Sequence, residues 1–279
     1  MYRGRTISLS FPPFTPWVKR IVIACGAIFF LQVVLKAFAP KAYDDLLIYF
    51  GLVPVGVVGH GFIWQLVTYS FLHGGIWHIL LNMLTLWMFG AQEEQDWGSR
   101  RFLEFYLFCV VGAALVTIGV AYLNWGVDPT IPTVGASGGI YGLLVAFGML
   151  YGDREIFMFP IPIAIKAKYL VGILIFIVLI SAFQPSQGNV ANFAHLGGAL
   201  FGFLYLKLLP RRGLSFAATE RYFGLRNSYY RWKRKRAGKK FEVYMRDHDR
   251  KVTFDEHGNY VPPDENDKTN GGSKSGWVN

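Results

Sequence analysis

Ser137 lies among glycines, in the segment GASGG at 135–139, where an apolar run begins that reaches Tyr151. A serine at the start of a helix is often an N-cap, whose side-chain oxygen accepts a hydrogen bond from a free backbone N–H. The same hydroxyl is a nucleophile when a general base lies within about 2.6–3.2 Å. The sequence therefore leaves two interpretations of Ser137, and the position of a base decides between them.

His195 is the candidate base. It lies in a later apolar run, and an ionisable side chain inside such a run is a candidate functional residue. The alternative is a structural histidine that is hydrogen-bonded between helices. Tyr141 follows Ser137 by one helical turn on the same face, so its ring could pack against the imidazole and fix it. For Tyr141 the alternative is ordinary core packing.

The runs that contain Ser137 and His195 each carry a pair of glycines with helical spacing. Small residues four apart let two helix backbones approach closely, and a nucleophile and a base on separate helices need that approach. The spacing also occurs in helices that only pack against each other. The pairs are Gly138 with Gly142 and Gly198 with Gly202.

His78 and Asn82 are spaced i, i+4, so both project from one face of a helix. Their N–H groups could stabilise the oxyanion of a tetrahedral intermediate. The backbone N–H of Ser137 is a further donor, which the helix dipole favours. The alternative is a polar pair that holds helices together.

Metal binding is a competing interpretation, because His73, His78 and His195 could be ligands. No cysteine joins these histidines, and the sequence has no His-Glu-x-x-His motif. The glycines follow no phosphate-binding loop pattern. We therefore expect no metal and no cofactor.

The composition indicates a membrane protein. Hydrophobic residues make up 53% of the 279-residue chain and charged residues 16%, and the mean hydropathy is +0.31. A soluble domain would carry more charge and shorter apolar runs. Cys25 and Cys109 both lie inside apolar runs, so a disulfide framework is not indicated.

Six apolar runs are candidates for membrane spans, since about 20 helical residues cross a hydrocarbon core of about 30 Å. The fourth is short, which suits a helix whose end opens into a water-filled cavity. Residues 40–77 lie between the first two runs and are rich in aromatic residues, so we expect a structured loop in the membrane interface. The expected spans are 21–39, 78–94, 101–123, 137–151, 169–183 and 193–209.

A cleavable signal peptide is the alternative for the first run, because Ala37-Phe38-Ala39 resembles a cleavage site. The run is longer than the apolar region of a typical signal peptide, and Lys36 interrupts the approach to the site. An uncleaved first span is therefore the better interpretation.

The basic residues favour an orientation with both termini in the cytoplasm, by the positive-inside rule. Ser137 and His195 then lie at the outer ends of their helices, so the site would open to the outer face. The inner loops would hold Arg100, Arg101, Arg154, Lys166 and Lys168, whereas the outer loops would hold Lys36 and Lys41.

Taken in order, these motifs resemble those of the rhomboid intramembrane serine proteases. The resemblance covers roughly residues 19–210, and the ordered set is far more specific than any one motif. It implies an all-α integral membrane protein: a six-helix bundle with a structured first loop and a Ser–His dyad that has no acidic third member. The motifs are Trp64-Gln65, His73, His78-x-x-x-Asn82, Gly135-x-Ser137-Gly138 and His195-x-x-Gly198-x-x-x-Gly202.

The resemblance implies a role for each site residue. Ser137 would be the nucleophile and His195 the base. His78, Asn82 and the backbone N–H of Ser137 would form the oxyanion hole, and Tyr141 would support His195. The supporting glycines would be Gly135, Gly138, Gly198 and Gly202.

Three further positions bear on the resemblance. His73 and Glu94 fit family positions with structural roles. The family often has Trp-Arg in its first loop, where this chain has Trp64-Gln65. A neutral amide thus replaces a guanidinium, which calls the stability of the loop into question.

The implied activity is endopeptidase cleavage of transmembrane segments in single-pass or multi-pass membrane proteins, near the outer face. A substrate helix would enter past the fifth span and the loop at 184–192. The expected location is a bacterial inner membrane. The alternatives are a catalytically inactive rhomboid-like protein that binds clients, and an unrelated transporter or channel. Transporters tend to have internal repeats, and we find no convincing repeat in this sequence.

The chain divides into an N-terminal basic arm at 1–18, the protease domain at 19–210 and a basic, partly disordered tail at 211–279. The segment 231–236 (RWKRKR) would attract anionic lipids, at about 1 kcal/mol for each charge near the surface. RNA binding is the alternative, which the adjacent membrane span disfavours, so no nucleic-acid partner is expected. The last part, with Pro262-Pro263 and Gly271-Gly272, is predicted to be disordered.

Overall fold

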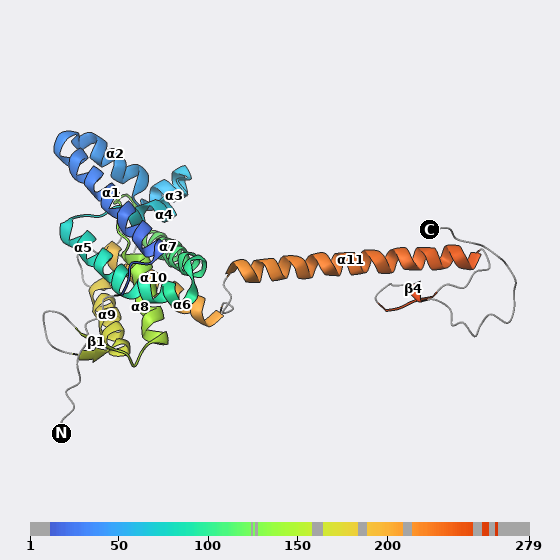
Figure 1. The fold of residues 1–279 in the computed structure, drawn as a ribbon. Coiled ribbons are helices and arrows are strands. Elements are labelled where there is room, and N and C mark those ends of the chain that lie inside the picture. Colours follow the sequence, from blue (N-terminus) through green and yellow to red (C-terminus); the bar gives the residue numbers. More distant parts are fainter. Residues whose placement is uncertain are drawn as a thin grey trace, which may run out of the picture. The chain divides into compact units, whose positions relative to one another are not determined.

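The computed structural model describes residues 12–123, 125, 128–157, 164–183, 189–208, 214–247, 253–256 and 260–261. The chain divides into two compact units, Met1–Leu214 and Ser215–Asn279. The described part of the first unit is a bundle of helices with one small hairpin (Figure 1). The expected basic arm lies largely outside the described residues.

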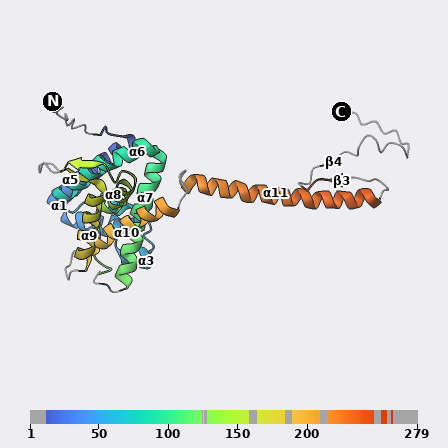
Figure 2. The same ribbon diagram turned by 90° about the horizontal axis from the view of Figure 1, so that it is seen from below.

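Helices α7 (Ser99–Tyr122), α8 (Ser137–Leu150) and α10 (Asn189–Leu208) pack against one another in this unit (Figures 1 and 2). Helix α9 (Ala167–Ala182) contacts both α8 and α10. The limits of these four helices follow the expected spans, with α10 starting four residues before the expected 193. The interior is formed by aromatic, aliphatic and small side chains, among them Phe102, Tyr106, Leu143 and Ala146.

Two described helices, α1 (Pro16–Phe38) and α7, are long and apolar enough to cross a membrane. A third crossing is formed if the segments Gln65–Phe71 and Ile76–Trp97, which meet at 101°, are taken together. Helices α8 and α9 are apolar but shorter. The chain is thus a mostly helical membrane protein, and the count of six spans stays a prediction.

Helix α1 begins at Pro16, five residues before the expected limit, because Glu94 caps its first turn. The Glu94 carboxylate accepts hydrogen bonds from the backbone N–H groups of Trp17, at 3.0 Å, and Val18, at 3.1 Å. Ser99 donates to the same carboxylate at 2.5 Å. A negative charge at a helix N-terminus satisfies free N–H groups and the dipole, so Glu94 joins α1 to the start of α7.

The loop expected at 40–77 is structured, and much of it is helical. It contains α2 (Pro40–Phe50), α3 (Pro54–His60), α4 (Gln65–Thr68) and the 3₁₀ helix η1 (Tyr69–Phe71). The second expected span has three parts: α5 (Ile76–Thr85), the π-helical turn η2 (Leu86–Gly90) and α6 (Ala91–Trp97). The sequence did not predict these helices within the loop or the π turn.

Gln65 holds this loop together. Its side chain is fully buried, and its Oε1 accepts a hydrogen bond from the backbone N–H of Val53 at 3.0 Å. Its Nε2 donates to the carbonyl groups of Ile48, at 2.8 Å, and Tyr49, at 3.3 Å. The neutral amide therefore ties α2 to the start of α3, and this answers the concern that the residue type raised.

The segment 152–168, expected to be a loop, contains a hairpin of β1 (Glu155–Phe157) and β2 (Ala164–Lys166). The strands are antiparallel, and Glu155 pairs with Lys166. Next to the hairpin, Lys168 lies 2.7 Å from Asp153. The hydrogen bond and charge of Lys168 hold the pKa of the Asp153 carboxyl below its usual range.

The second unit consists of α11 (Leu214–Asp247) and a hairpin of β3 (Thr253–Phe254) and β4 (Tyr260–Val261). The sequence did not predict this 34-residue helix. Arginines stack on aromatic rings one turn away along it, with Arg236 5.4 Å from the Trp232 ring and Arg226 5.8 Å from the Tyr230 ring. The segment expected to be disordered, 262–279, lies outside the described residues.

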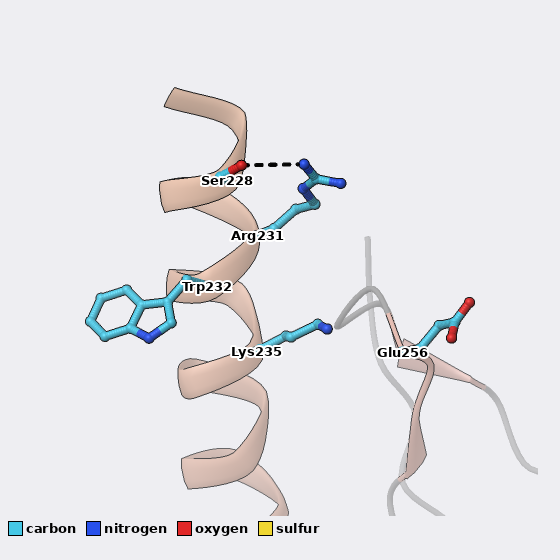
Figure 3. Close-up of a pocket in the computed structure, with 5 residues that line it drawn as sticks. All are labelled: Ser228, Arg231, Trp232, Lys235 and Glu256. Carbon is cyan, nitrogen blue, oxygen red and sulfur yellow. Dashed lines mark hydrogen bonds between the residues drawn. The ribbon is translucent and has the colours of Figure 1, made fainter. Parts of the chain in front are cut away.

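A pocket of about 460 Å³ lies on α11. Figure 3 shows the residues that line it, Ser228, Arg231, Trp232, Lys235 and Glu256. Lys235 extends toward the hairpin that carries Glu256, whereas Trp232 points to the other side of the helix. Arg231 donates a hydrogen bond to Ser228 at 3.4 Å. The pocket thus has basic residues along α11 and a carboxylate opposite them.

Candidate active site

Glycines bring the backbones of α8 and α10 into direct contact. A Cβ atom added at Gly198 would lie 1.8 Å from the carbonyl oxygen of Gly138. One added at Gly202 would lie 2.8 Å from the Cα atom of Gly142. No other residue fits at such distances from backbone, so these glycines set the separation of the two helices.

This contact brings Ser137 and His195 together. The Nε2 atom of His195 lies 2.7 Å from the Oγ atom of Ser137, at hydrogen-bond distance. Ser137 is the first residue of α8, and the N-cap position belongs to Ala136. The capping interpretation of Ser137 is therefore wrong, because the hydroxyl pairs with an imidazole from another helix.

The other side of the imidazole is held by an aromatic ring. The rings of Tyr141 and His195 are stacked, with centroids 4.4 Å apart and planes at 16°. The Nδ1 atom of His195 is buried and has no hydrogen-bond partner among the described residues. Within that part of the chain, stacking and helix packing orient the ring, and no carboxylate does so.

His78 reaches the same place from α5. Gly135, just before α8, has a φ of +129°, which glycine adopts without strain. A Cβ atom there would lie 2.8 Å from His78 Nε2 and 3.6 Å from Ser137 Oγ. The His78 imidazole therefore packs directly on the backbone turn that presents the serine.

Asn82 follows His78 by one turn of α5 and is 7% exposed. Its Nδ2 atom is buried and has no hydrogen-bond partner among the described residues. An unpaired buried donor is costly, at about 1–3 kcal/mol, so such a group calls for an explanation. One explanation is that Asn82 Nδ2 donates to an acceptor that is present only during a reaction.

The sequence left metal binding by His73, His78 and His195 as a competing interpretation. The part of the chain that the structure describes contains no group of three or more His, Cys, Asp or Glu side chains that could hold an ion. His73 and His78 do lie close together, with ring centroids 5.2 Å apart and one ring edge-on to the other. Their contact is one of packing, not of ligands around a shared centre.

Two residues at the site were not predicted from the sequence. The backbone carbonyl of Tyr69 accepts a hydrogen bond from the N–H of Gly135 at 2.9 Å, which anchors the turn before Ser137. Gln32 of α1 bonds to the backbone of His73. Gln32 could have been found as a lone amide in an apolar run, whereas a backbone contact such as that of Tyr69 leaves no signal in a single sequence.

The packed apolar helices define an integral membrane protein of the helical-bundle class. Within this bundle, a serine is paired with a histidine. Comparison with known proteins supplies the family. Residues 60–212, more than half of the chain, match the family model of the Rhomboid domain. The chain belongs to the rhomboid family.

Curated relatives agree with this assignment. Rhomboid protease GluP of Bacillus subtilis is 33% identical over 174 residues, which are 61% of this chain and 31% of GluP. RHOMBOID-like protein 4 of Arabidopsis thaliana is 38% identical over 144 residues, 50% of this chain and 32% of that protein. Rhomboid protease AarA of Providencia stuartii is 30% identical over 196 residues, 66% of this chain and 69% of AarA. The chain thus spans about a third of the first two relatives and about two thirds of AarA.

Proposed function

We propose that the protein is an intramembrane serine endopeptidase that cleaves transmembrane segments of other membrane proteins. The observation that carries this proposal is the 2.7 Å contact between Ser137 Oγ and His195 Nε2, which lies between two apolar helices. Relatives named as rhomboid proteases support the same activity. Ser137 is the nucleophile and His195 the general base.

The first step is attack by Ser137 on the scissile carbonyl carbon. The lone pair of neutral His195 at Nε2 accepts the hydroxyl proton as the new C–O bond forms. The stacked Tyr141 ring restricts rotation of the imidazole, so the nitrogen stays aimed at the hydroxyl. A ring held in place by packing needs no buried carboxylate, whose charge is costly in an apolar bundle.

The negative charge that develops on the carbonyl oxygen needs donors. The side chains of His78 and Asn82 and the backbone N–H of Ser137 supply them. Asn82 supports this role because its buried Nδ2 group has no partner among the described residues. A donor held unpaired in the resting enzyme becomes paired only as the oxyanion forms, which favours the transition state over the ground state.

Collapse of the tetrahedral intermediate expels the new amino terminus, which takes the proton from His195. The acyl-enzyme on Ser137 is then attacked by water, and His195 again accepts a proton. The second intermediate releases the new carboxyl terminus and restores the hydroxyl. Both halves of the reaction use the same base and the same oxyanion donors.

The proposed membrane arrangement has six spans, with both termini in a bacterial cytoplasm and the site open to the outer face of the inner membrane. It rests on the excess of Lys and Arg in the inner loops. A substrate helix enters past α9, whose lipid-facing side exposes Ile173, Phe176 and Ile177. The loop at 184–188, on the same proposed route, lies outside the described residues.

The proposed domains are the arm at 1–18, the protease domain at 19–210 and the tail at 211–279. The tail follows a membrane span, and residues 231–237 of α11 are all exposed. On the cytoplasmic side its cations meet anionic lipid headgroups. We therefore assign the basic surface of α11 (Arg231, Lys233, Arg234, Lys235 and Arg236) to the bilayer surface and not to nucleic acid.

Fluorophosphonate labelling of the purified protein, followed by cleavage of a model transmembrane substrate, tests the proposal. Labelling and cleavage are expected for the wild type, and both should be lost in Ser137→Ala and His195→Ala. Ser228→Ala is the matched control, because it removes a hydroxyl from α11, which belongs to the second compact unit. A folded wild type that neither reacts nor cleaves would identify a client-binding member of the family without catalysis.

A further inference from the structure

Gln32 is a polar side chain on the buried face of α1. It continues the buried positions Val18, Ile21 and Cys25 and is only 2% exposed. Both ends of its amide are used. Its Nε2 donates to the carbonyl oxygen of His73 at 3.3 Å, and its Oε1 accepts from the backbone N–H of His73 at 3.0 Å. The side chain thus pairs with the N–H and the C=O of one residue, as a residue of a neighbouring antiparallel strand would.

His73 needs these partners because of its place in the chain. It lies between η1, which ends at Phe71, and α5, which begins at Ile76. A non-helical segment lacks the hydrogen bonds of a regular element, and buried backbone groups must still be paired. Gln32 supplies both bonds and so fixes the backbone just before the helix that carries His78 and Asn82.

Gly74, the residue after His73, connects the fixed backbone to the side chain of His78. The backbone N–H of Gly74 donates a hydrogen bond to His78 Nδ1 at 3.3 Å. A backbone N–H can only donate, so Nδ1 carries the lone pair, and in the neutral ring the proton is on Nε2. His78 Nε2 is the ring nitrogen that lies, together with Cε1, against Gly135 beside Ser137. The tautomer fixed at Gly74 therefore places a donor where the oxyanion forms.

His73 has the opposite tautomer. Its Nδ1 lies 3.3 Å from the carbonyl oxygen of Phe71, which can only accept, so the proton is on Nδ1. The ring is 1% exposed and meets the His78 ring edge-on at 5.2 Å. Two neutral rings with opposite tautomers pack together, and the position of the first limits the movement of the second.

We propose that Gln32 is a positioning residue that holds His78 as an Nε2–H donor, acting through the backbone of His73 and Gly74. The proposal rests on the oxyanion role of His78 in the proposed function. Gln32 touches neither substrate nor nucleophile. Its effect on the reaction passes through His78 alone.

A double-mutant cycle tests this route. If Gln32 acts through His78, the effects of substituting the two residues on kcat are not additive. Gln32→Leu in the wild-type background should lower kcat about 10-fold and leave KM unchanged, since the donor is misplaced and not removed. In a His78→Ala background the same change should alter kcat less than about 2-fold. Cys25→Ala is the control: Cys25 lies on the same face of α1 and contacts Ser70 at 4.0 Å, outside the segment that leads to His78.

Equal factors in the two backgrounds would overturn the proposal and leave Gln32 with a structural role only. Thermal unfolding of each variant establishes that folded protein is compared. An inactive wild type would instead refute the proposed function.

A second measurement needs neither activity nor a variant. Nitrogen-15 NMR of imidazole-labelled wild-type protein should show His78 protonated at Nε2 and His73 at Nδ1. A His78 ring protonated at Nδ1 would refute the relay through Gly74, whatever the kinetics show. Because it is made on the wild-type protein, this measurement tests the relay even if Gln32→Leu fails to fold.

Discussion

The Tyr141 ring lies almost parallel to the His195 imidazole, with centroids 4.4 Å apart and planes at 16°. Both residues also belong to the contact between α8 and α10, so the stack is set by the same glycines that bring Ser137 to His195. Orientation of the base is thus a property of helix packing. It follows that the ring of Tyr141, more than its hydroxyl, should matter for the reaction.

Replacing Tyr141 tests this view. Tyr141→Ala removes the stacked face and should lower kcat about 10-fold, because an aromatic pair contributes about 0.5–1.5 kcal/mol and 1.4 kcal/mol is tenfold in rate. Tyr141→Phe keeps the face and should retain kcat within about 2-fold of the wild type. Cleavage kinetics with a model transmembrane substrate give both values. Equal losses in the two variants would assign the effect to the hydroxyl instead.

Asn82→Ala should separate activity from stability. Loss of one oxyanion donor is expected to lower kcat by about 10²–10³-fold. The melting temperature should not fall, because the resting protein buries this Nδ2 group without a partner in its described part. Thr85→Ala, on the exposed side of the same helix, is the control for both readouts. A destabilised Asn82→Ala protein with normal turnover would assign Asn82 to helix packing.

The residues of the candidate site could be found from the sequence because residue type and helical spacing single them out. Ser137, Tyr141 and His195 can be placed on their helices by a period of 3.6 residues, and the glycines mark where backbones meet. Whether this geometry catalyses a reaction is a separate question, which the labelling experiment addresses.

Other features depend on contacts that no local pattern encodes. The strands β1 and β2 have three residues each, too few for an alternation to be detected. Helix α11 has no continuous apolar stripe, so its charged segment gave no helical signal. From the sequence, glutamine in place of arginine at position 65 put the stability of the first loop in doubt. The structure shows that the Gln65 amide bonds to the backbone of Ile48, Tyr49 and Val53.

Gly198→Ala should destabilise the bundle strongly. Its methyl group would lie 1.8 Å from a backbone oxygen of α8, so the helices must separate, and overpacking typically costs about 1–3 kcal/mol or more. Gly26→Ala in α1 is the matched control, because nothing lies within 4 Å of its added Cβ atom. Reversible unfolding in mixed micelles measures both. Equal stabilities of the two variants would mean that α8 and α10 are not in close contact.

Gln65→Leu should loosen the first loop. It leaves the buried N–H of Val53 and two carbonyl groups without their partner, at a cost of about 1–3 kcal/mol. Limited chymotrypsin digestion should cut the aromatic-rich segment 40–77 faster than in the wild type. Gln92→Leu, at a partly exposed position with bonds only to exposed groups, should leave the rate unchanged. Unchanged digestion of Gln65→Leu would show that other contacts hold the loop.

The basic surface of α11 should be protected by an anionic bilayer. In nanodiscs that contain phosphatidylglycerol, trypsin should cut within 231–240 more slowly than in phosphatidylcholine nanodiscs, because each cation near the surface gains about 1 kcal/mol. Salt at about 1 M shortens the Debye length to about 3 Å and should abolish the difference. A variant with Lys233, Lys235, Lys239 and Lys240 changed to Gln should lose most of the protection while retaining protease activity, because these residues lie in the second compact unit and not among the site residues. Equal cleavage in the two lipids at low salt would refute lipid contact by the tail and would make a protein or RNA partner the next candidate for the same cations.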